Sequence, residues 1–518
     1  MRGIAGEVHA ALRDLVVVSD LHLGRGFNRE AKRWHALESF FYDGDFHAFC
    51  EWLCRDAEER GVRFALILNG DVLDLLRIEP EPPPEAGSAL ERRFGPAVTP
   101  AVAARMVRDI LRGHTAFADA LALVVAAGHD VIVLPGNHDL ELQWEPVQEE
   151  MRRAVADRVE ARGAPRDALQ RLRFERWFFH EPGRIWIEHG CQYDPENAFR
   201  FPLRRRLADS PQAATAAERD MPLGNFFQKY LYNAFGAITF IVPSSRANYR
   251  YFRFLLANRP RLLVSVARSH GRFLVQLLRR LARAPAGAWH REAEQLHAAE
   301  LAEIAERSGL GDRLYAIDAL KFVGADAARA ASGLFRQAAK LAAGVALVTA
   351  SAMVVWASAW RALDALMVGF AWKTLLSLAL YLVFGAVGLA ALIAAALRVP
   401  ADEPPRPLAA AAARIANVLD VPLVAFGHTH EETVVRIPRR EGDAWYFNTG
   451  TWIAVFAHDI LVPRERVQYT FLRVRGAEGE LLQWSPGRGR AMPVILFEEE
   501  GGPRAGLGPP APLAERPH

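Results

Sequence analysis

The chain has 518 residues, of which 51% are hydrophobic, and a formal net charge of +3 at pH 7. This length exceeds that of one ordinary domain, so we expect one core that carries insertions. The nearly balanced charge gives no reason to expect a nucleic-acid partner, and three cysteines are too few for a disulfide framework. Because the first residues contain no continuous apolar stretch, we also expect no cleaved signal peptide.

Short apolar runs alternate with helical patterns in the first part of the chain. Runs rich in Val, Ile and Leu are expected to form buried strands at 15–18, 65–68, 131–134 and 185–187. Between them, 46–60 and 101–127 repeat apolar residues at the helical period. Further strands are expected at 423–426, 445–447 and 467–475. Strands that alternate with helices predict an α/β fold with a layered sheet.

Polar turns follow these expected strands at the point where each strand ends. The turns are Ser19-Asp20, Asn69-Gly70-Asp71, Pro135-Gly136-Asn137, Glu188-His189-Gly190 and Gly427-His428. In open α/β sheets, ligand sites collect beyond the carboxyl ends of the strands. We therefore expect the turns to form one shared site.

A long insertion separates the fourth of these strands from the fifth. Its first part, roughly 200–340, is helix-like and basic, with arginines between 246 and 283 that alternate with apolar residues. Two runs without a formal charge follow, at 341–360 and 374–397. At about 1.5 Å per residue, each could cross a hydrocarbon core of about 30 Å. We predict a two-helix transmembrane hairpin; a pair of buried helices in a soluble protein is the alternative.

The polar turns carry the side chains of a metal site. In chain order they read Asp20-Leu21-His22, Gly70-Asp71-Val72-Leu73-Asp74, Gly136-Asn137-His138-Asp139, His189-Gly190 and Gly427-His428-Thr429-His430. Carboxylate, imidazole and amide oxygen together suit Mn²⁺, Fe or Zn²⁺. A single Asp or Asn after a strand is usually a turn residue or a helix cap. As a set, these side chains could supply two adjacent metal ions of the kind that clamp a phosphoryl displacement.

Five motif blocks in this order resemble the calcineurin-like metallophosphoesterase superfamily. The resemblance covers the core between residues 20 and 430, but neither the insertion at 200–400 nor the tail. It implies a four-layer αββα sandwich, here with a helical insertion that contains the transmembrane hairpin. It also implies a metal-dependent phosphoesterase, a hydrolase that acts on phosphoester or phosphoanhydride bonds. The implied cofactors are two divalent metal ions, with Mn²⁺ preferred and Fe, Zn²⁺ or Mg²⁺ as alternatives.

The resemblance also assigns a role to each residue of the blocks. Asp20, His22 and His430 would bind one metal ion, Asn137, His189 and His428 the other, and Asp71 would bridge the two. A hydroxide held between the metals would be the nucleophile. His138 would stabilise the developing charge or protonate the leaving oxygen, with Asp139 orienting its ring. Asp74 would support the ligands, and Asn448, in the turn 448–451, would support the site. Tyr193, Asp194 and Asn197 are either pocket-lining residues or part of an ordinary loop.

The chain is expected to divide into five parts. These are the N-terminal part of the core at 1–200, a basic helical insertion or cap at 201–340, the hairpin at 341–397, the C-terminal part of the core at 398–500 and a disordered tail at 501–518. Basic residues flank the hairpin on both outer sides, which predicts a cell-membrane location with the catalytic domain on the cytoplasmic side.

The insertion leaves the substrate open. The position of the insertion gives the chain a distant similarity to UDP-2,3-diacylglucosamine pyrophosphohydrolases of the same superfamily, which carry an acyl-binding cap there. They usually have Arg where this chain has His138, and they lack two spanning segments, so their substrate is not transferred. The substrate contains phosphate and is either lipid-linked, as anchoring at 341–360 and 374–397 would favour, or soluble. The alternatives are a nuclease or nucleotide phosphodiesterase of the same superfamily, and a non-catalytic membrane docking module.

Overall fold

The chain forms two compact units, Met1–Ala327 with Arg406–His518, and Ala328–Pro405. The computed structural model describes residues 13–78, 89–95, 97–203, 205, 214, 217–218, 220–235, 240–241, 259–283, 286–322, 350, 353–362, 364–365, 369–397, 407–439, 442–457, 462–463 and 467–494. The predicted disordered tail at 501–518 lies outside these residues. All the candidate site residues lie in the first unit.

The larger sheet of the first unit contains seven strands among the described residues. Its order is β17(Arg490–Pro493), β16(Glu478–Ser485), β15(Thr470–Arg475), β1(Asp14–Val18), β4(Phe64–Asn69), β5(Asp130–Leu134) and β6(Leu172–Phe174). The pairs from β1 to β6 are parallel, and β15 joins β1 in antiparallel orientation. β1 and β4 are buried along their whole length, as is typical of parallel strands that are covered on both faces.

The smaller sheet brings together strands from both ends of the chain. Its order is β11(Glu432–Pro438), β12(Asp443–Thr449), β10(Leu423–Phe426), β8(Ile185–Glu188) and β7(Phe178–Glu181). β8 and β10 are parallel neighbours, with Ile185 opposite Leu423 and Ile187 opposite Ala425. The insertion therefore leaves the core after one strand and returns to it at the adjacent strand.

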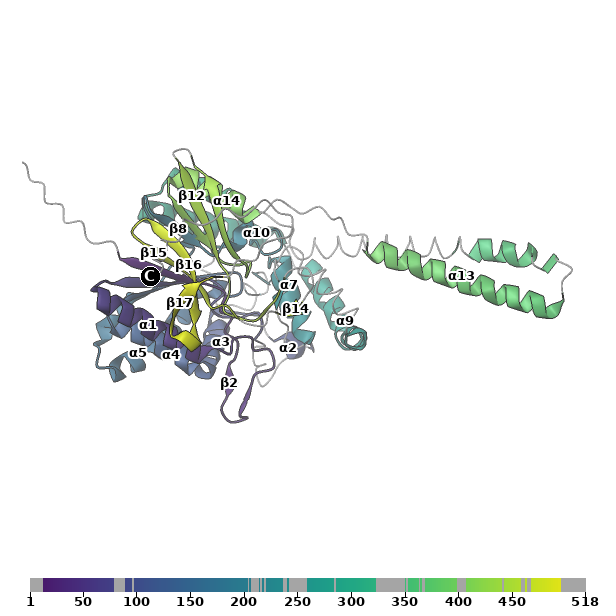
Figure 1. The fold of residues 1–518 in the computed structure, drawn as a ribbon, viewed down its shortest axis with the longest axis horizontal. Helices are drawn as coiled ribbons and strands as arrows, with labels where there is room; N and C mark the ends of the chain where they lie inside the picture. Colours follow the sequence, from purple (N-terminus) through teal and green to yellow (C-terminus); the bar gives the residue numbers. More distant parts are fainter. Residues whose placement is uncertain are drawn as a thin grey trace, which may run out of the picture. The chain divides into compact units, whose positions relative to one another are not determined.

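The two sheets pack face to face between layers of helices (Figure 1). Leu15, Val17 and Ile67 of the larger sheet belong to one buried cluster with Ile187 and Phe447 of the smaller sheet. Because side chains alternate along a strand, Val16 and Val18 face the opposite way. There they join a cluster with the helices α1(Asp43–Arg60), α3(Pro100–Gly113), α4(Thr115–Ala126) and α5(Glu145–Ala161).

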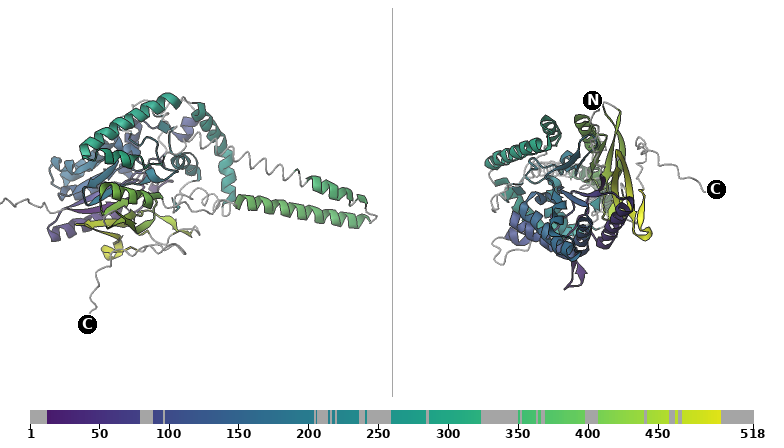
Figure 2. Two further views of the ribbon diagram at one scale, coloured as in Figure 1. Left: turned by 90° about the horizontal axis from the view of Figure 1, so that it is seen from above. Right: turned by 90° about the vertical axis from the view of Figure 1, so that its left-hand side faces the viewer.

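The outer face of the smaller sheet is covered by helices that lie between β8 and β10 in the sequence (Figure 2). Trp186, Val424 and Phe426 share a cluster with α10(Ala286–Ser308), α11(Asp312–Asp318) and α14(Pro407–Leu419). The first unit is therefore mixed α/β, with two sheets that contain parallel strands. Its remaining elements are β2(Phe27–Asn28), β3(Arg33–Trp34), α2(Ala89–Phe94), η1(Leu140–Gln143), η2(Arg166–Arg171), η3(Cys191–Tyr193), α7(Leu223–Tyr230), η4(Tyr232–Phe235), β9(Phe240–Ile241), α9(Pro260–Arg283), β13(Val455–Ala457), β14(Val462–Pro463) and η6(Pro486–Arg488).

The second unit corrects the predicted transmembrane hairpin. It contains α13(Phe370–Leu397), but within the described residues no helix has both the length and the apolar character needed to cross a membrane. A hairpin needs two helices of about 20 residues each. In the first predicted leg, 341–360, residues 341–349 lie outside the described part, and the longest described helical stretch there is 353–362.

The prediction was wrong because it counted residues without formal charge. A run of residues without formal charge does not establish that one continuous helix is apolar enough to cross a membrane. The predicted cell-membrane location and the cytoplasmic placement of the catalytic domain were deduced from this hairpin. They are corrected together with it.

Candidate metal centre

The polar turns of both sheets meet at the carboxyl ends of β1, β4, β5, β8 and β10. Backbone hydrogen bonds continue from strand to strand into the turns. Asp20 N donates to Gly70 O over 3.1 Å, and His22 N donates to Asp71 O over 2.9 Å. On the other sheet, Gly427 N donates to His189 O over 3.0 Å. The turns are therefore held in register before any side chain is considered.

The backbone at several of these turns adopts the left-handed conformation. Eight residues other than glycine have a positive φ in the described chain, and five of them belong to the turns. They are Asp20 at 54°, His22 at 51°, Asp71 at 50°, His428 at 74° and His430 at 59°. Such conformations are unfavourable for residues with a Cβ and tend to cluster at functional sites. Five in one place indicate that the surrounding structure holds these side chains in required positions.

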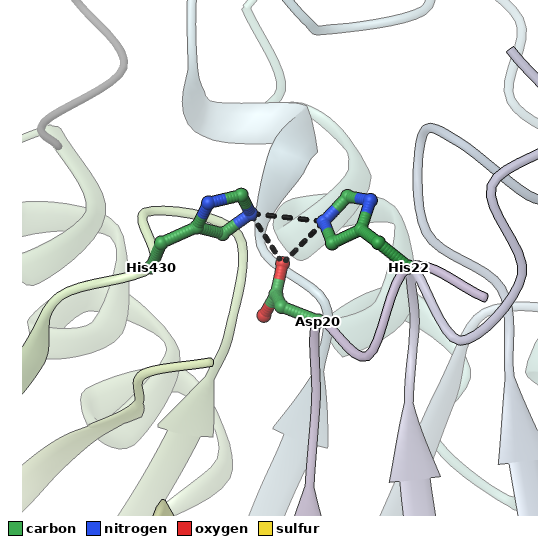
Figure 3. A group of neighbouring side chains, drawn as sticks. All are labelled: Asp20, His22 and His430. Atoms are coloured by element: carbon green, nitrogen blue, oxygen red, sulfur yellow. Dashed lines mark hydrogen bonds and ion pairs between the residues drawn. The ribbon is translucent and has the colours of Figure 1, made fainter. Parts of the chain in front are cut away.

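Asp20, His22 and His430 form a buried group whose ligand atoms face one another (Figure 3). His22 Nε2 lies 3.0 Å from His430 Nε2, and His430 Nε2 lies 3.2 Å from Asp20 Oδ1. The other carboxylate oxygen, Asp20 Oδ2, accepts hydrogen bonds from Ser19 Oγ and His428 N. Asp20 Oδ1 is buried and makes no hydrogen bond of good geometry within the described chain. A buried oxygen directed at two imidazole nitrogens fits a cation site.

A second group consists of Asp71, His189 and His428. His189 Nε2 lies 3.2 Å from Asp71 Oδ2 and 3.3 Å from the side-chain oxygen of Asn137. The other ring nitrogen, His189 Nδ1, lies 3.0 Å from Asn69 O. Because a carbonyl oxygen only accepts, Nδ1 must carry the proton, and in the neutral ring Nε2 offers a lone pair to the site.

Asp71 connects the two groups. Its Oδ2 lies 3.2 Å from His189 Nε2 and 3.8 Å from His22 Nε2, while its Oδ1 accepts a hydrogen bond from His138 N over 2.7 Å. One carboxylate oxygen is therefore within reach of imidazoles from both groups.

His138 is oriented by Asp74. His138 Nδ1 lies 2.9 Å from Asp74 Oδ1, and His22 Nδ1 lies 3.2 Å from Asp74 Oδ2. These three residues form the third buried group that could hold a metal ion, although Asp74 contacts Nδ1 of His22 and not the Nε2 that faces His430. Burial would raise the pKa of Asp74, but His138 and His22 hold it well below its usual range.

Asp139 takes a different part from the one expected. Both of its oxygens accept hydrogen bonds from the backbone, Oδ1 from Gly136 and Asp71 and Oδ2 from Val72 and Leu73, over 2.7–3.2 Å. Burial, and then the neighbouring Asp71, raise the pKa of Asp139 to about 7. Asp139 thus fixes the shape of two turns, and the carboxylate against the His138 ring belongs to Asp74.

Burial and the neighbouring carboxylates shift the pKa values of the histidines in the centre in different directions. Burial lowers the pKa of His22, but Asp20 and Asp74 outweigh it and raise this pKa to about 10. Asp71 and Asp20 likewise overcome burial and raise the pKa of His189 to about 9. Burial dominates at His430, whose pKa falls to about 4. The same buried carboxylates that favour protonated imidazoles can favour a divalent cation, which replaces the protons when it binds.

Glycines allow the candidate ligands to approach the turns closely. Gly70 has φ +79°, and a Cβ there would meet His189 Nδ1 at 2.5 Å. A Cβ on Gly136 would collide with Asp71 Oδ1, and one on Gly427 would meet Asp20 Oδ2 at 2.5 Å. The glycine in each of these blocks therefore makes room for a candidate ligand that another block supplies.

The turn at 448–451 is hydrogen-bonded to the turns that carry Asp20 and His428. The side chain of Asn448 donates from Nδ2 to Gly427 O and accepts from Gly450 N. Thr451 Oγ1 donates to Asp20 O over 2.6 Å, and Thr449 Oγ1 lies 2.6 Å from Ser19 Oγ. These bonds connect the end of β12 to the turns that carry Asp20 and His428.

Comparison with known proteins assigns no family to the chain. No protein-family model matches the sequence, and no curated protein matches it. The structure by itself supports a coarser statement: it has buried His and Asp groups that could hold metal ions.

Two residues of the centre carried little or no signal in the sequence. Asp194, which follows β8, lies with its Oδ2 2.8 Å from His428 Nε2. Asn225, on α7 of the insertion, exchanges two hydrogen bonds with Asn137. Asp194 stands close behind a motif block, which made it one of several open candidates. Asn225 stands in none of the blocks, so only the packing of the insertion reveals it.

Proposed function

We propose that the chain is a phosphohydrolase that works with two divalent metal ions, as its resemblance to the calcineurin-like metallophosphoesterases implies. The observation that carries the proposal is the position of Asp71. Its Oδ2 lies within 4 Å of imidazole nitrogens from two different groups, His189 at 3.2 Å and His22 at 3.8 Å. A carboxylate shared in this way is suited to bridge adjacent cations.

The donor atoms divide into two sets around this carboxylate. Asp20, His22 and His430 would hold one ion, and Asn137, His189 and His428 the other, with Asp71 common to both. The mixture of carboxylate, imidazole and amide oxygen favours Mn²⁺, with Fe, Zn²⁺ or Mg²⁺ as alternatives. When bound, such ions would polarise the phosphoryl oxygens and make water a nucleophile near neutral pH.

His138 would supply the proton that the leaving oxygen needs. It is 8% exposed, whereas Asp20 and His22 are fully buried, so it is more accessible than these ligands. Asp74 accepts from its Nδ1, which fixes the ring and leaves Nε2 as the nitrogen for proton transfer. Asp74 also contacts His22, so one carboxylate would align a ligand and the proton donor.

The chemistry of the centre indicates the type of bond that is cleaved, but not the rest of the substrate. A pair of cations with a proton donor suits a phosphoester or a pyrophosphate bond. A lipid-linked substrate has lost its main support with the corrected hairpin, so soluble and lipid-linked phosphates enter the test on equal terms.

The test is hydrolysis of a substrate panel by the full chain supplied with Mn²⁺. The panel contains aryl phosphates, nucleotides, single-stranded DNA, and lipid-linked phosphates and pyrophosphates in detergent. We expect activity that a chelator abolishes and that falls at least about 100-fold in Asp71→Asn, because that variant weakens both cation positions. Asp119→Asn, the same change at a partly exposed position on α4, should leave activity unchanged.

Two results would reject the proposal. Wild-type protein that holds no divalent metal after equilibration would instead favour a non-catalytic docking module. Activity that survives both the chelator and Asp71→Asn would place the chemistry elsewhere. Cleavage of single-stranded DNA alone would keep the metal centre but make the protein a nuclease.

A further inference from the structure

We propose that Asn225, on helix α7 of the insertion, is a positioning residue that makes Asn137 present its oxygen to a cation. The inference rests on the proposed two-metal centre and adds to it a residue outside the motif blocks. It assigns the insertion a part in completing one of the two metal positions.

The contact between the two asparagines is buried and reciprocal. Asn225 is 1% exposed and Asn137 is 3% exposed. Asn225 Nδ2 donates to the backbone oxygen of Asn137 over 2.6 Å, and Asn137 Nδ2 donates to Asn225 Oδ1 over 3.0 Å. Each side-chain amide thus fixes the other.

The orientation of both amides follows from hydrogen-bond chemistry. The backbone oxygen of Asn137 can only accept, so the atom of Asn225 that faces it must be the NH₂ group. The oxygen of Asn225 is then the atom that faces the side chain of Asn137, which must answer with its own NH₂ group. The Asn137 oxygen is thereby turned toward His189 Nε2, 3.3 Å away. A cation requires this oxygen, because an amide NH₂ has no lone pair to offer.

Helix α7 is itself fixed against the loop that follows β8. Gly224 N donates to Glu196 O over 2.8 Å, and a Cβ on Gly224 would collide with the side chain of Asn197. Asn197 Nδ2 donates over 2.8 Å to Asp194 Oδ2, the same oxygen that contacts His428. On its other side, α7 packs through Phe226 and Tyr230 against Phe94 and Leu277.

The supports of the two metal positions therefore differ in origin. Asn137 and His428 are held through α7 and the loop 194–197. Asp20 and His22 are held by Ser19 and Asp74, which belong to the turns after β1 and β4. Loss of Asn225 should weaken the position formed by Asn137, His189 and His428 and leave the other nearly intact.

The experiment measures Mn²⁺ binding to the full chain without any substrate. Metal content is measured across a range of free Mn²⁺ concentrations, and electron paramagnetic resonance distinguishes paired from single Mn²⁺ ions. We expect two ions per wild-type chain. In Asn225→Leu, which keeps the size but removes both hydrogen bonds, one ion should bind about 10–100-fold more weakly.

Two further variants separate orientation from general loosening. Asn225→Asp keeps an oxygen that accepts from Asn137 Nδ2 but sets a second oxygen, which cannot donate, against Asn137 O. It should therefore bind the second ion more weakly than the wild type and more tightly than Asn225→Leu does, and it serves as the test if the Leu variant does not fold. Asn233→Leu is the matched control. Asn233 Nδ2 donates to Leu76 O and so joins the insertion to the core without contacting Asn137. The Asn233→Leu variant should retain both ions.

The proposal is overturned if Asn225→Leu binds two Mn²⁺ ions as the wild type does, or if both ions weaken equally. A wild type that binds no divalent metal overturns it together with the proposed function. If the wild type binds two ions and hydrolyses none of the panel substrates, the proposed function fails alone. In that case the dependence of the second ion on Asn225 still decides this inference.

Discussion

His189 and Gly70 show how single residues constrain one another in the centre. His189 Nδ1 donates to Asn69 O, which brings its ring against the next residue, Gly70. Gly70 has φ +79°, a conformation that glycine adopts without strain. The ligand can therefore occupy its position only while residue 70 has no side chain.

We expect Gly70→Ala to remove the His189 ligand and to destabilise the fold. The new Cβ would meet His189 Nδ1 at 2.5 Å and would also strain the backbone. The backbone term alone is about 1–2 kcal/mol, and displacement of a buried ring adds to it. Urea unfolding and Mn²⁺ content of the purified chain measure the two effects.

Gly61→Ala separates the collision from the backbone strain. Gly61 ends α1 with φ +64°, and a Cβ there has nothing within 4 Å. This control should lose about 1 kcal/mol of stability and keep its metal content. Equal losses in both variants, or a full metal content in Gly70→Ala, would show that the close approach to His189 is unimportant.

The sequence indicated which residues are candidates but not how their side chains divide the work. The ordered blocks contain Asp74 and Asp139, and both stand in turns after strands. Only the fold shows that Asp74 faces His138 and His22, while Asp139 accepts four backbone N–H groups. Asn225 was beyond prediction because its contact with Asn137 depends on the path of the insertion.

At the scale of elements, buried polar residues fix the segment that follows His22. The carboxylate of Glu38 accepts hydrogen bonds from the backbone of Gly24, Gly26, Ser39 and Phe40. His114, at the junction of α3 and α4, lies 3.2 Å from Glu38 Oε2 and 2.9 Å from Asp43 Oδ2 at the start of α1. Three elements are therefore joined through one histidine.

We expect this connection to depend on pH. Burial opposes a charge on His114, but Asp43 and Glu38 outweigh it and raise its pKa to about 9, from about 6.5 in an unfolded chain. Its contribution to stability is full below pH 6.5 and is lost as the pH rises through 9. The difference in unfolding free energy between wild type and His114→Gln should shrink by about 3 kcal/mol from pH 6 to pH 10.

Urea unfolding of both proteins across this pH range provides the measurement. A difference that stays constant would mean that His114 acts through packing or neutral hydrogen bonds and not through its charge. A difference that grows with pH would contradict the sign of the argument.

The elements themselves were predictable where a periodic pattern is long and local. The expected strand at 131–134 is β5 without its first residue, and the helical pattern at 46–60 lies within α1. The pattern at 101–127 is interrupted at Gly113 and His114, where the chain divides into α3 and α4. A Cβ on Gly113 would collide with Arg25 O, so a segment far away in the sequence requires glycine at the break.

At the scale of the whole molecule, the centre depends on a small part of a long chain. Its candidate ligands come from positions between 20 and 430, yet all of them belong to the unit formed by Met1–Ala327 and Arg406–His518. β8 and β10 are neighbours in one sheet, so the core closes across the point where the insertion leaves it. α7, with Asn225, also belongs to this unit, whereas Ala328–Pro405 contributes no ligand to the described groups.

We therefore expect that a flexible Gly- and Ser-rich linker can replace 328–405 without loss of metal binding. An ion that binds the folded chain but not the unfolded chain stabilises the fold by about 2.7 kcal/mol when its free concentration is 100 times its dissociation constant. The shift in unfolding free energy on addition of Mn²⁺ should be the same in the full chain and in the shortened chain, and Asp71→Asn should diminish it in both. A shortened chain that folds but shows no shift would mean that 328–405 is needed to form the centre, contrary to the division of the molecule into two units.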